Sequence, residues 1–172
     1  MNIAMIETPV LITSIENHLE IKNDILNGID AMGTHNLIEN KDKISNTDWH
    51  LPPSVNRSYG QFFEPVFNKT LNNINEFFGY KKYEQKLSLK NYWFQQYKKD
   101  DTHNWHIHNE SLFSNVYYVE LPNESAKTTF LIGNKEIEID VKEGDVLTFP
   151  SCFLHCSKPN GHGRKTVISF NI

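Results

Sequence analysis

The stretch that decides the fold is HNWHIHNESLFSNVYYVELP, residues 103–122, which places three of the eight histidines within six residues and continues into a strand-like run. Alternate side chains of a strand share a face, so His106 and His108 point the same way and can bind one ion, while Ile107 faces the other side. By the same alternation His103 lies off this face, and we expect it in a loop or at the rim. The pair predicts a metal site, and a solvated strand face is the simpler alternative.

The pattern on either side of this stretch indicates helices first and strands afterwards. Residues 15–33 and 62–78 carry apolar residues at helical spacing, and each stripe ends at a glycine. Thr13 to Glu16 has the spacing of a capping box for the first helix, and residues 34–61 read as irregular. Apolar residues then alternate in six runs, at residues 86–97, 113–121, 127–132, 135–141, 145–149 and 164–172. This order predicts an α+β protein with a β-sandwich or jelly roll in its C-terminal half.

Length and composition favour one globular domain. The 172 residues suit a single domain, 1–172, with a helical N-terminal part (1–83) and a β core (84–172). A net charge of −4 and a pI near 6.0 argue against a nucleic-acid partner. No apolar run is long enough for a membrane span, and the first residues lack the basic segment of a signal peptide. With only two cysteines, we expect reduced thiols and a cytoplasmic protein.

A third histidine extends the candidate metal site. In VKEGDVLTFPSCFLHCSKPNGHGRKTVISF, residues 141–170, His155 opens a run after a buried strand, and Arg164 follows nine residues later in the last strand. A histidine pair on one strand and a third histidine from a strand distant in sequence can assemble a facial three-ligand site in a jelly roll. Cys152 and Cys156 flank His155, but zinc thiolate sites usually need a second cysteine pair.

Several segments, in order, resemble the iron(II)/2-oxoglutarate-dependent oxygenases, particularly small bacterial and phage members and the prolyl-4-hydroxylase-like branch. The resemblance covers about residues 88–172 and rests on a tyrosine, Tyr97, nine residues before His106, and on the segments VYYVELP (116–122), SAKTTF (125–130), KEGDVLTF (142–149), FLHCSKP (153–159) and RKTVISFN (164–171). Three positions depart from the family pattern. His108 stands where the family usually has aspartate, Asp100 replaces a glycine, and the Gly-Gly before Thr128 is missing.

The resemblance implies a double-stranded β-helix, that is a jelly-roll or cupin-like barrel, with the N-terminal helices packed on one sheet. It also implies that His106, His108 and His155 hold Fe(II), which uses O2 and 2-oxoglutarate. Three neutral imidazoles leave the charge of the ion uncompensated, and Glu110, with Asp101 more remote, is the nearest candidate carboxylate.

The cosubstrate site follows from the same resemblance. We expect Arg164 to bind the far carboxylate of 2-oxoglutarate, because a guanidinium gives a carboxylate a charged two-point contact. Thr166 shares the face of Arg164 and Tyr97 comes from the facing strand, so both can add hydroxyl groups, whereas Lys165 points away by alternation. The implied activity is hydroxylation of an unidentified peptidyl, amino-acid or small-molecule substrate, with release of succinate and CO2.

Two other functions stay open at the level of sequence. GDVLTFPSCFLH, residues 144–155, also fits the later motif of a cupin-type metalloprotein that does not use 2-oxoglutarate. A non-catalytic jelly-roll binding module with a structural metal is the second alternative, because one fold hosts many functions. Among the aromatic residues near the motifs, Trp105 and Tyr117 are the candidates for lining the substrate entrance.

Overall fold

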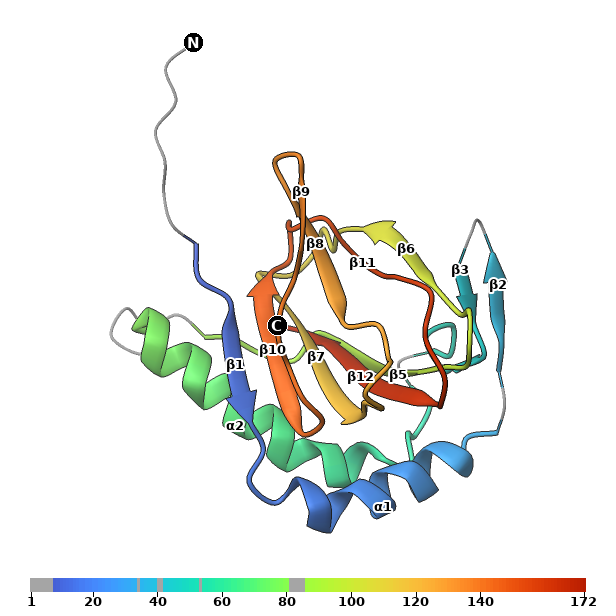
Figure 1. The fold of residues 1–172 in the computed structure, drawn as a ribbon. Helices are drawn as coiled ribbons and strands as arrows, with labels where there is room; N and C mark the ends of the chain where they lie inside the picture. Colours follow the sequence, from blue (N-terminus) through green and yellow to red (C-terminus); the bar gives the residue numbers. More distant parts are fainter. Residues whose placement is uncertain (1–7, 34, 40–41, 53, 81–85) are drawn as a thin grey trace.

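The computed structural model describes residues 8–33, 35–39, 42–52, 54–80 and 86–172, which form antiparallel sheets and two helices (Figure 1). The larger sheet has six strands in the order β1 (Leu11–Ser14), β10 (Asp145–Pro150), β7 (Phe113–Glu120), β12 (Lys165–Asn171), β5 (Asn91–Tyr97) and β4 (Asn46–Thr47). The smaller sheet has the order β6 (His103–His106), β11 (His155–Ser157), β8 (Thr128–Ile132) and β9 (Lys135–Glu138). Strands β2 (Leu37–Glu39) and β3 (Asp42–Ile44) form a separate hairpin.

Two helices, α1 (His18–Asp30) and α2 (Gly60–Phe78), lie along the outer side of the six-stranded sheet (Figure 1). The apolar stripe of α2 is buried in one core cluster with side chains of that sheet, and the helix ends at Gly79, whose φ of 67° is left-handed. Helix α1 approaches the start of α2 closely at Gly28, where an added Cβ would lie 2.8 Å from backbone atoms of Tyr59. The helices therefore form a layer that packs on the outer face of the sheet.

Alternation along β12 decides which side chains meet the helices. Ile168 and Phe170 belong to the core cluster under the helices, whereas Lys165 and Ser169 line the cavity on the inner side of the sheet. Strand β5, the neighbour of β12, likewise sends Gln95 to the inner side. The inner faces of the two sheets enclose the second core cluster and the candidate site.

A bulge shapes the smaller sheet. His155 of β11 pairs with His106 of β6, but Ser157, two residues on, pairs with His103, three residues back. The extra residue in β6 interrupts the alternation of its side chains. As a consequence His103 lies on the same side of the strand as His106, and both line the cavity.

The predicted mixture of helices and antiparallel strands is confirmed, with local corrections. Each of the six alternating runs contains a strand: β5, β7, β8, β9, β10 and β12. Thr13 does not cap the first helix, because it lies in β1 and pairs with β10. Residues 34–61 contain β2, β3 and β4 rather than only irregular chain. Within the described residues, no helix combines the length and apolar character that crossing a membrane requires.

Candidate metal centre and adjoining cavity

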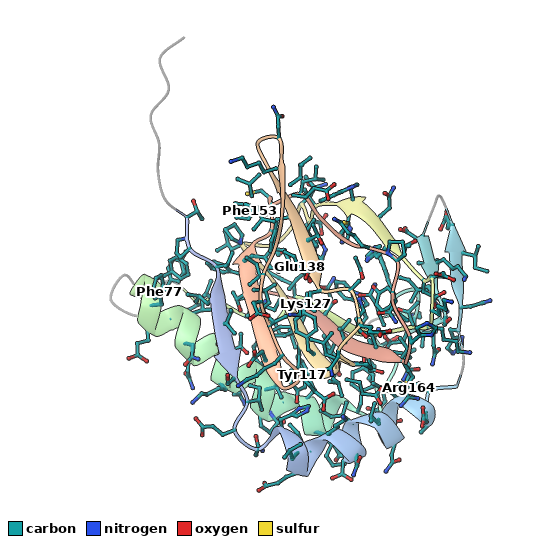
Figure 2. All side chains as sticks on the ribbon, viewed as in Figure 1. Phe77, Tyr117, Lys127, Glu138, Phe153 and Arg164 are labelled. Carbon is teal, nitrogen blue, oxygen red and sulfur yellow. The ribbon has the colours of Figure 1, made fainter. Side chains whose placement is uncertain are left out.

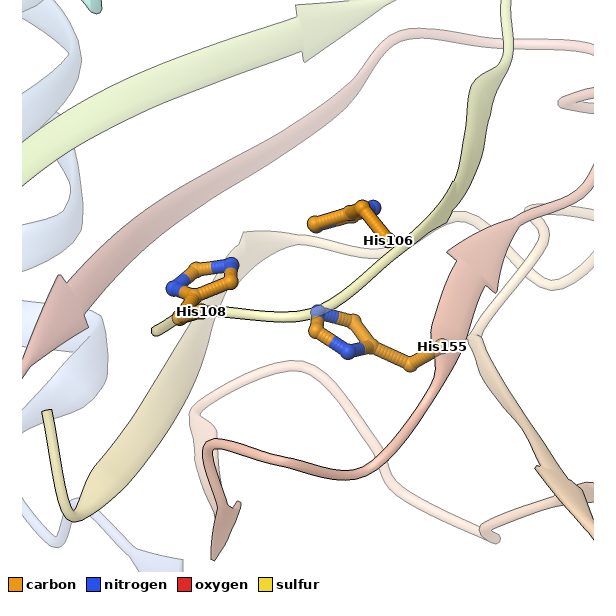
Figure 3. A group of neighbouring side chains, drawn as sticks. All are labelled: His106, His108 and His155. Atoms are coloured by element: carbon orange, nitrogen blue, oxygen red, sulfur yellow. The ribbon is translucent and has the colours of Figure 1, made fainter. Parts of the chain in front are cut away.

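Three histidines converge between the two sheets, as Figure 3 shows. His106 ends β6, His155 begins β11, and His108 lies two residues beyond the end of β6. One ring nitrogen from each lies within 4.8 Å of the corresponding nitrogens of the other two. Strand pairing places the backbone of His106 opposite that of His155, and a hydrogen bond of 2.9 Å from the His108 amide to the carbonyl of Ser151 positions the backbone of His108.

Backbone carbonyl groups orient two of the three rings. Nδ1 of His106 lies 2.7 Å from the carbonyl oxygen of Asn104, and Nδ1 of His155 lies 2.8 Å from that of Phe153. A carbonyl oxygen only accepts, so in both rings Nδ1 carries the proton and donates. The lone pair of Nε2 is then free to bind a cation, which is the arrangement that metal-binding histidines use.

An asparagine orients the third ring. Nδ1 of His108 lies 2.7 Å from Oδ1 of Asn171, and Ser114 donates to the same oxygen at 3.2 Å. The side-chain nitrogen of Asn171 donates to Oδ1 of Asn91 at 2.9 Å, which identifies the Asn171 oxygen as the atom facing His108. His108 therefore also presents Nε2 as an acceptor, and the donor set of three imidazoles fits a divalent transition metal such as iron or zinc.

Burial keeps these rings neutral. It lowers the pKa of His106 and His108, and it lowers the pKa of His155 to about 3. The pKa of His106 is lowered further by the charge that His108 would carry, and the pKa of His155 by the charges of His106 and His108. At neutral pH the nitrogen lone pairs are thus available to a metal without loss of a proton.

Neither candidate carboxylate joins the three histidines. Glu110 is exposed and belongs to a different surface pocket. Asp101 is buried in a turn, where its carboxylate accepts hydrogen bonds from the hydroxyl of Ser45 and the amide of Lys98. The ligand set available in the described part of the chain is therefore uncharged.

A cavity with about 450 Å³ of space not filled by atoms, part of it open to solvent, adjoins the three histidines. None of the described residues that line it is Asp or Glu. Its cationic side chain is Lys165, which is 2% exposed and lies 4.0 Å above the ring of Tyr97. A cavity with a lysine and no acid is suited to an anion.

Lys165 is held in place by two hydrogen bonds. Its Nζ donates to the carbonyl oxygen of Ala126 at 2.8 Å and to the hydroxyl of Ser157 at 2.5 Å. An ammonium group has three donors, so a third remains for a ligand. Burial lowers the pKa of Lys165 to about 7, and an anionic ligand would restore its charge.

Arg164 and Thr166 do not face this cavity, in contrast to the expectation from sequence. Figure 2 shows Arg164 at the outside of the molecule, and its guanidinium pairs with Glu120 at 2.8 and 3.0 Å. Thr166 donates to the same carboxylate. The two residues do share a face, but it is the face of Ile168, which packs under the helices, so the inward position falls to Lys165.

Among the other predicted residues, Tyr97 lines the cavity and Tyr117 does not. Tyr117 is fully buried on the opposite face of the sheet, where its hydroxyl lies 2.7 Å from Nδ1 of His18. Trp93 lines the cavity, whereas Trp105 is not among its lining residues. A usable signal was that one face of β12 carries three polar residues beside Val167, namely Lys165, Ser169 and Asn171, whereas the other face carries the apolar Ile168 and Phe170.

The fold is similar to the folds of several solved prolyl hydroxylases and of another 2OG-Fe(II) oxygenase. A Pseudomonas putida prolyl-4-hydroxylase is similar over 95% of this chain and 92% of its own, with a TM-score of 0.65 and 17% identity. The viral collagen prolyl hydroxylase vCPH from Paramecium Bursaria Chlorella virus-1, in a 2OG complex, matches over 93% and 94%, with a TM-score of 0.58 and 18% identity. HygX from Streptomyces hygroscopicus, with nickel and 2-oxoglutarate bound, matches over 95% and 81%, with a TM-score of 0.63 and 12% identity. No protein-family model and no curated protein sequence matches the chain.

Proposed function

We propose that the chain is a 2-oxoglutarate-dependent non-haem iron(II) dioxygenase, built on a jelly-roll fold with its N-terminal helices packed on one sheet. One observation carries the proposal: three histidine Nε2 acceptors converge beside a cavity whose lining, within the described residues, has a buried lysine and no carboxylate. A metal with open positions next to a cation is what a chelating dicarboxylate requires.

The metal would be held by His106, His108 and His155, and a set of three protein ligands would leave coordination positions for a chelating cosubstrate and O2. When bound, the iron couples the oxidative decarboxylation of 2-oxoglutarate by O2 to hydroxylation of a substrate C–H bond, which yields succinate, CO2 and an alcohol. The chain's own contribution is to orient the three imidazoles, to bind the cosubstrate and to keep the site enclosed.

Lys165, in place of Arg164, would bind the far carboxylate of the cosubstrate. Its third N–H is available, and the hydroxyl of Ser157 and the carbonyl of Ala126 fix the position of Nζ. Tyr97 packs against the ammonium group and also lines the cavity. Arg164 and Thr166 would serve the structure instead, since both bind Glu120 of β7.

The similar folds support this assignment of the cosubstrate, because vCPH and HygX were both solved with 2-oxoglutarate. They support a hydroxylase without selecting a substrate, which we leave as peptidyl, amino-acid or small-molecule. We propose that the protein acts in the cytoplasm of a bacterium or of a phage-infected host cell, without nucleic-acid or membrane partners.

Anaerobic titration of the Fe(II)-loaded protein with 2-oxoglutarate tests the proposal. Chelation of the iron produces a visible charge-transfer absorption, and admission of air should then consume 2-oxoglutarate and release succinate, measured by mass spectrometry. Protein stripped of metal is the control. A protein that binds Fe(II) tightly but shows neither the absorption nor succinate would refute the dioxygenase and leave the cupin-type or structural-metal alternative.

A further inference from the structure

A fourth histidine stands beside the three that converge. His103 lines the same cavity, and its ring stacks on that of His106 with centroids 4.0 Å apart and an interplanar angle of 25°. It is not a member of the group whose nitrogens lie within 4.8 Å of one another. His103 therefore borders the metal centre without belonging to the ligand set.

The hydrogen bonds of His103 differ from those of the other three histidines. Its Nδ1 lies 3.2 Å from the side-chain nitrogen of Gln95, and the side-chain oxygen of Gln95 accepts from the hydroxyl of Ser169 at 3.1 Å. Because an amide nitrogen only donates, Nδ1 of His103 is the acceptor and the ring proton is on Nε2. His106, His108 and His155 have the opposite tautomer, with the proton on Nδ1.

The two tautomers suit different tasks. A ring with a lone pair on Nε2 binds a cation, whereas a neutral ring with Nε2–H donates to an oxygen. Strand pairing places this donor beside the path of the cosubstrate: His106 pairs with His155 at the metal end, and His103 pairs with Ser157, whose hydroxyl binds Lys165 at the other end. A 2-oxo acid bound between the metal and Lys165 would pass next to His103.

We infer that Nε2–H of His103 donates a hydrogen bond to an oxygen of the metal-bound 2-oxo acid group, and that Gln95 and Ser169 set the tautomer that makes this possible. The inference rests on the proposed function. It makes His103 a residue that selects the 2-oxo acid over dicarboxylates that lack this group, including the product succinate. Lys165, by contrast, recognises the carboxylate that both molecules share.

The tautomer can be measured directly in the metal-free protein. Two-bond hydrogen–nitrogen NMR correlations of 15N-labelled histidine rings distinguish a protonated from an unprotonated Nε2. We expect Nδ1–H for His106, His108 and His155 and Nε2–H for His103, assigned by the loss of its signals in His103→Phe. A proton on Nδ1 of His103 would overturn the inference whether or not the protein binds 2-oxoglutarate.

Binding of two ligands that each keep part of 2-oxoglutarate then tests the role. Calorimetry on Mn(II)-loaded protein compares oxalate, a two-carbon chelator like the 2-oxo acid group, with succinate. His103→Phe keeps an aromatic ring on His106 but removes the donor, so oxalate affinity should fall about tenfold, with little change for succinate and for Mn(II). Gln95→Glu replaces the amide donor by an acceptor, and it should also weaken oxalate binding. His50→Phe, which replaces an exposed histidine, is the control.

The outcomes separate the inference from the function on which it rests. If wild-type protein binds oxalate and the variants His103→Phe and Gln95→Glu bind it equally well, this result overturns the inference alone. An equal loss of Mn(II) affinity in His103→Phe would do so too, because His103 would then act through the metal ligands. Wild-type protein that binds Mn(II) but neither 2-oxoglutarate nor oxalate would overturn both.

Discussion

Replacing Lys165 by methionine should abolish tight binding of 2-oxoglutarate, whereas the same replacement of its neighbour Arg164 should not. The two residues are adjacent cations where β12 begins, and their side chains point in opposite directions: Lys165 is 2% exposed inside the cavity, and the side chain of Arg164, which immediately precedes the strand, is 41% exposed and paired with Glu120. The variants Lys165→Met and Arg164→Met therefore each remove one basic side chain, the first inside the cavity and the second at the surface.

The expected magnitude follows from burial. Removing one partner of a buried, hydrogen-bonded charge pair costs about 3 kcal/mol of binding free energy, which corresponds to a roughly 150-fold larger dissociation constant. An exposed ion pair such as Arg164–Glu120 contributes only about 0.2–1 kcal/mol, and to stability rather than to ligand binding. Calorimetric titration of the Mn(II)-loaded protein with 2-oxoglutarate measures the dissociation constant of both variants.

Stability and metal binding are the controls for this experiment. Methionine fills the volume of the lysine stem, and removal of a desolvated charge offsets the loss of its hydrogen bonds to Ala126 and Ser157, so the melting temperature should change little. Mn(II) affinity should be preserved. If Arg164→Met weakened 2-oxoglutarate binding as much as Lys165→Met, the assignment of the inward cation would be refuted.

Three further predictions test the site and the fold. Asn171→Leu removes the acceptor that orients His108 and should weaken Mn(II) binding about 10- to 100-fold in a calorimetric titration; unchanged affinity would exclude His108 as a ligand. Gly28→Ala places a Cβ against the backbone of Tyr59 and should lower the urea-measured unfolding free energy by about 1–3 kcal/mol, whereas Asn27→Ala, at an exposed position, should not. Burial lowers the pKa of His18 in the folded protein below its ordinary 6.5, so the unfolded chain binds the proton more readily. The free energy of unfolding should therefore fall as the pH drops below 6.5, and His18→Gln should make this fall shallower.

Much of the fold could be read from local patterns. The six alternating runs each contain a strand, and the helical stripe at residues 62–78 is part of α2, because periodicity follows from which face of an element is buried. The short strands β1, β4 and β11 carry too few residues for a periodic signal. Pairing with distant strands, such as β1 with β10, is what makes them strands.

The site shows the same division. Sequence order alone brought forward His106, His108 and His155, since histidines at alternate positions and a third on a later run are visible without coordinates. The sequence did not show which face of β12 lies inside. We therefore expected Arg164 to point into the cavity, whereas in the structure Lys165 does so. His103 was assigned to the rim because the alternation was assumed to be unbroken.

The sequence by itself determined the types of element, the histidines available to a metal and the presence of two neighbouring cations where the last strand begins, because these depend on residues close together in the chain. Only the tertiary structure decided which cation points inward and that a bulge turns His103 toward the cavity. The physical reason is that a period of two tells which side chains share a face, while the layer packed against each face, here the helices over Ile168 and Phe170, decides which face is inside.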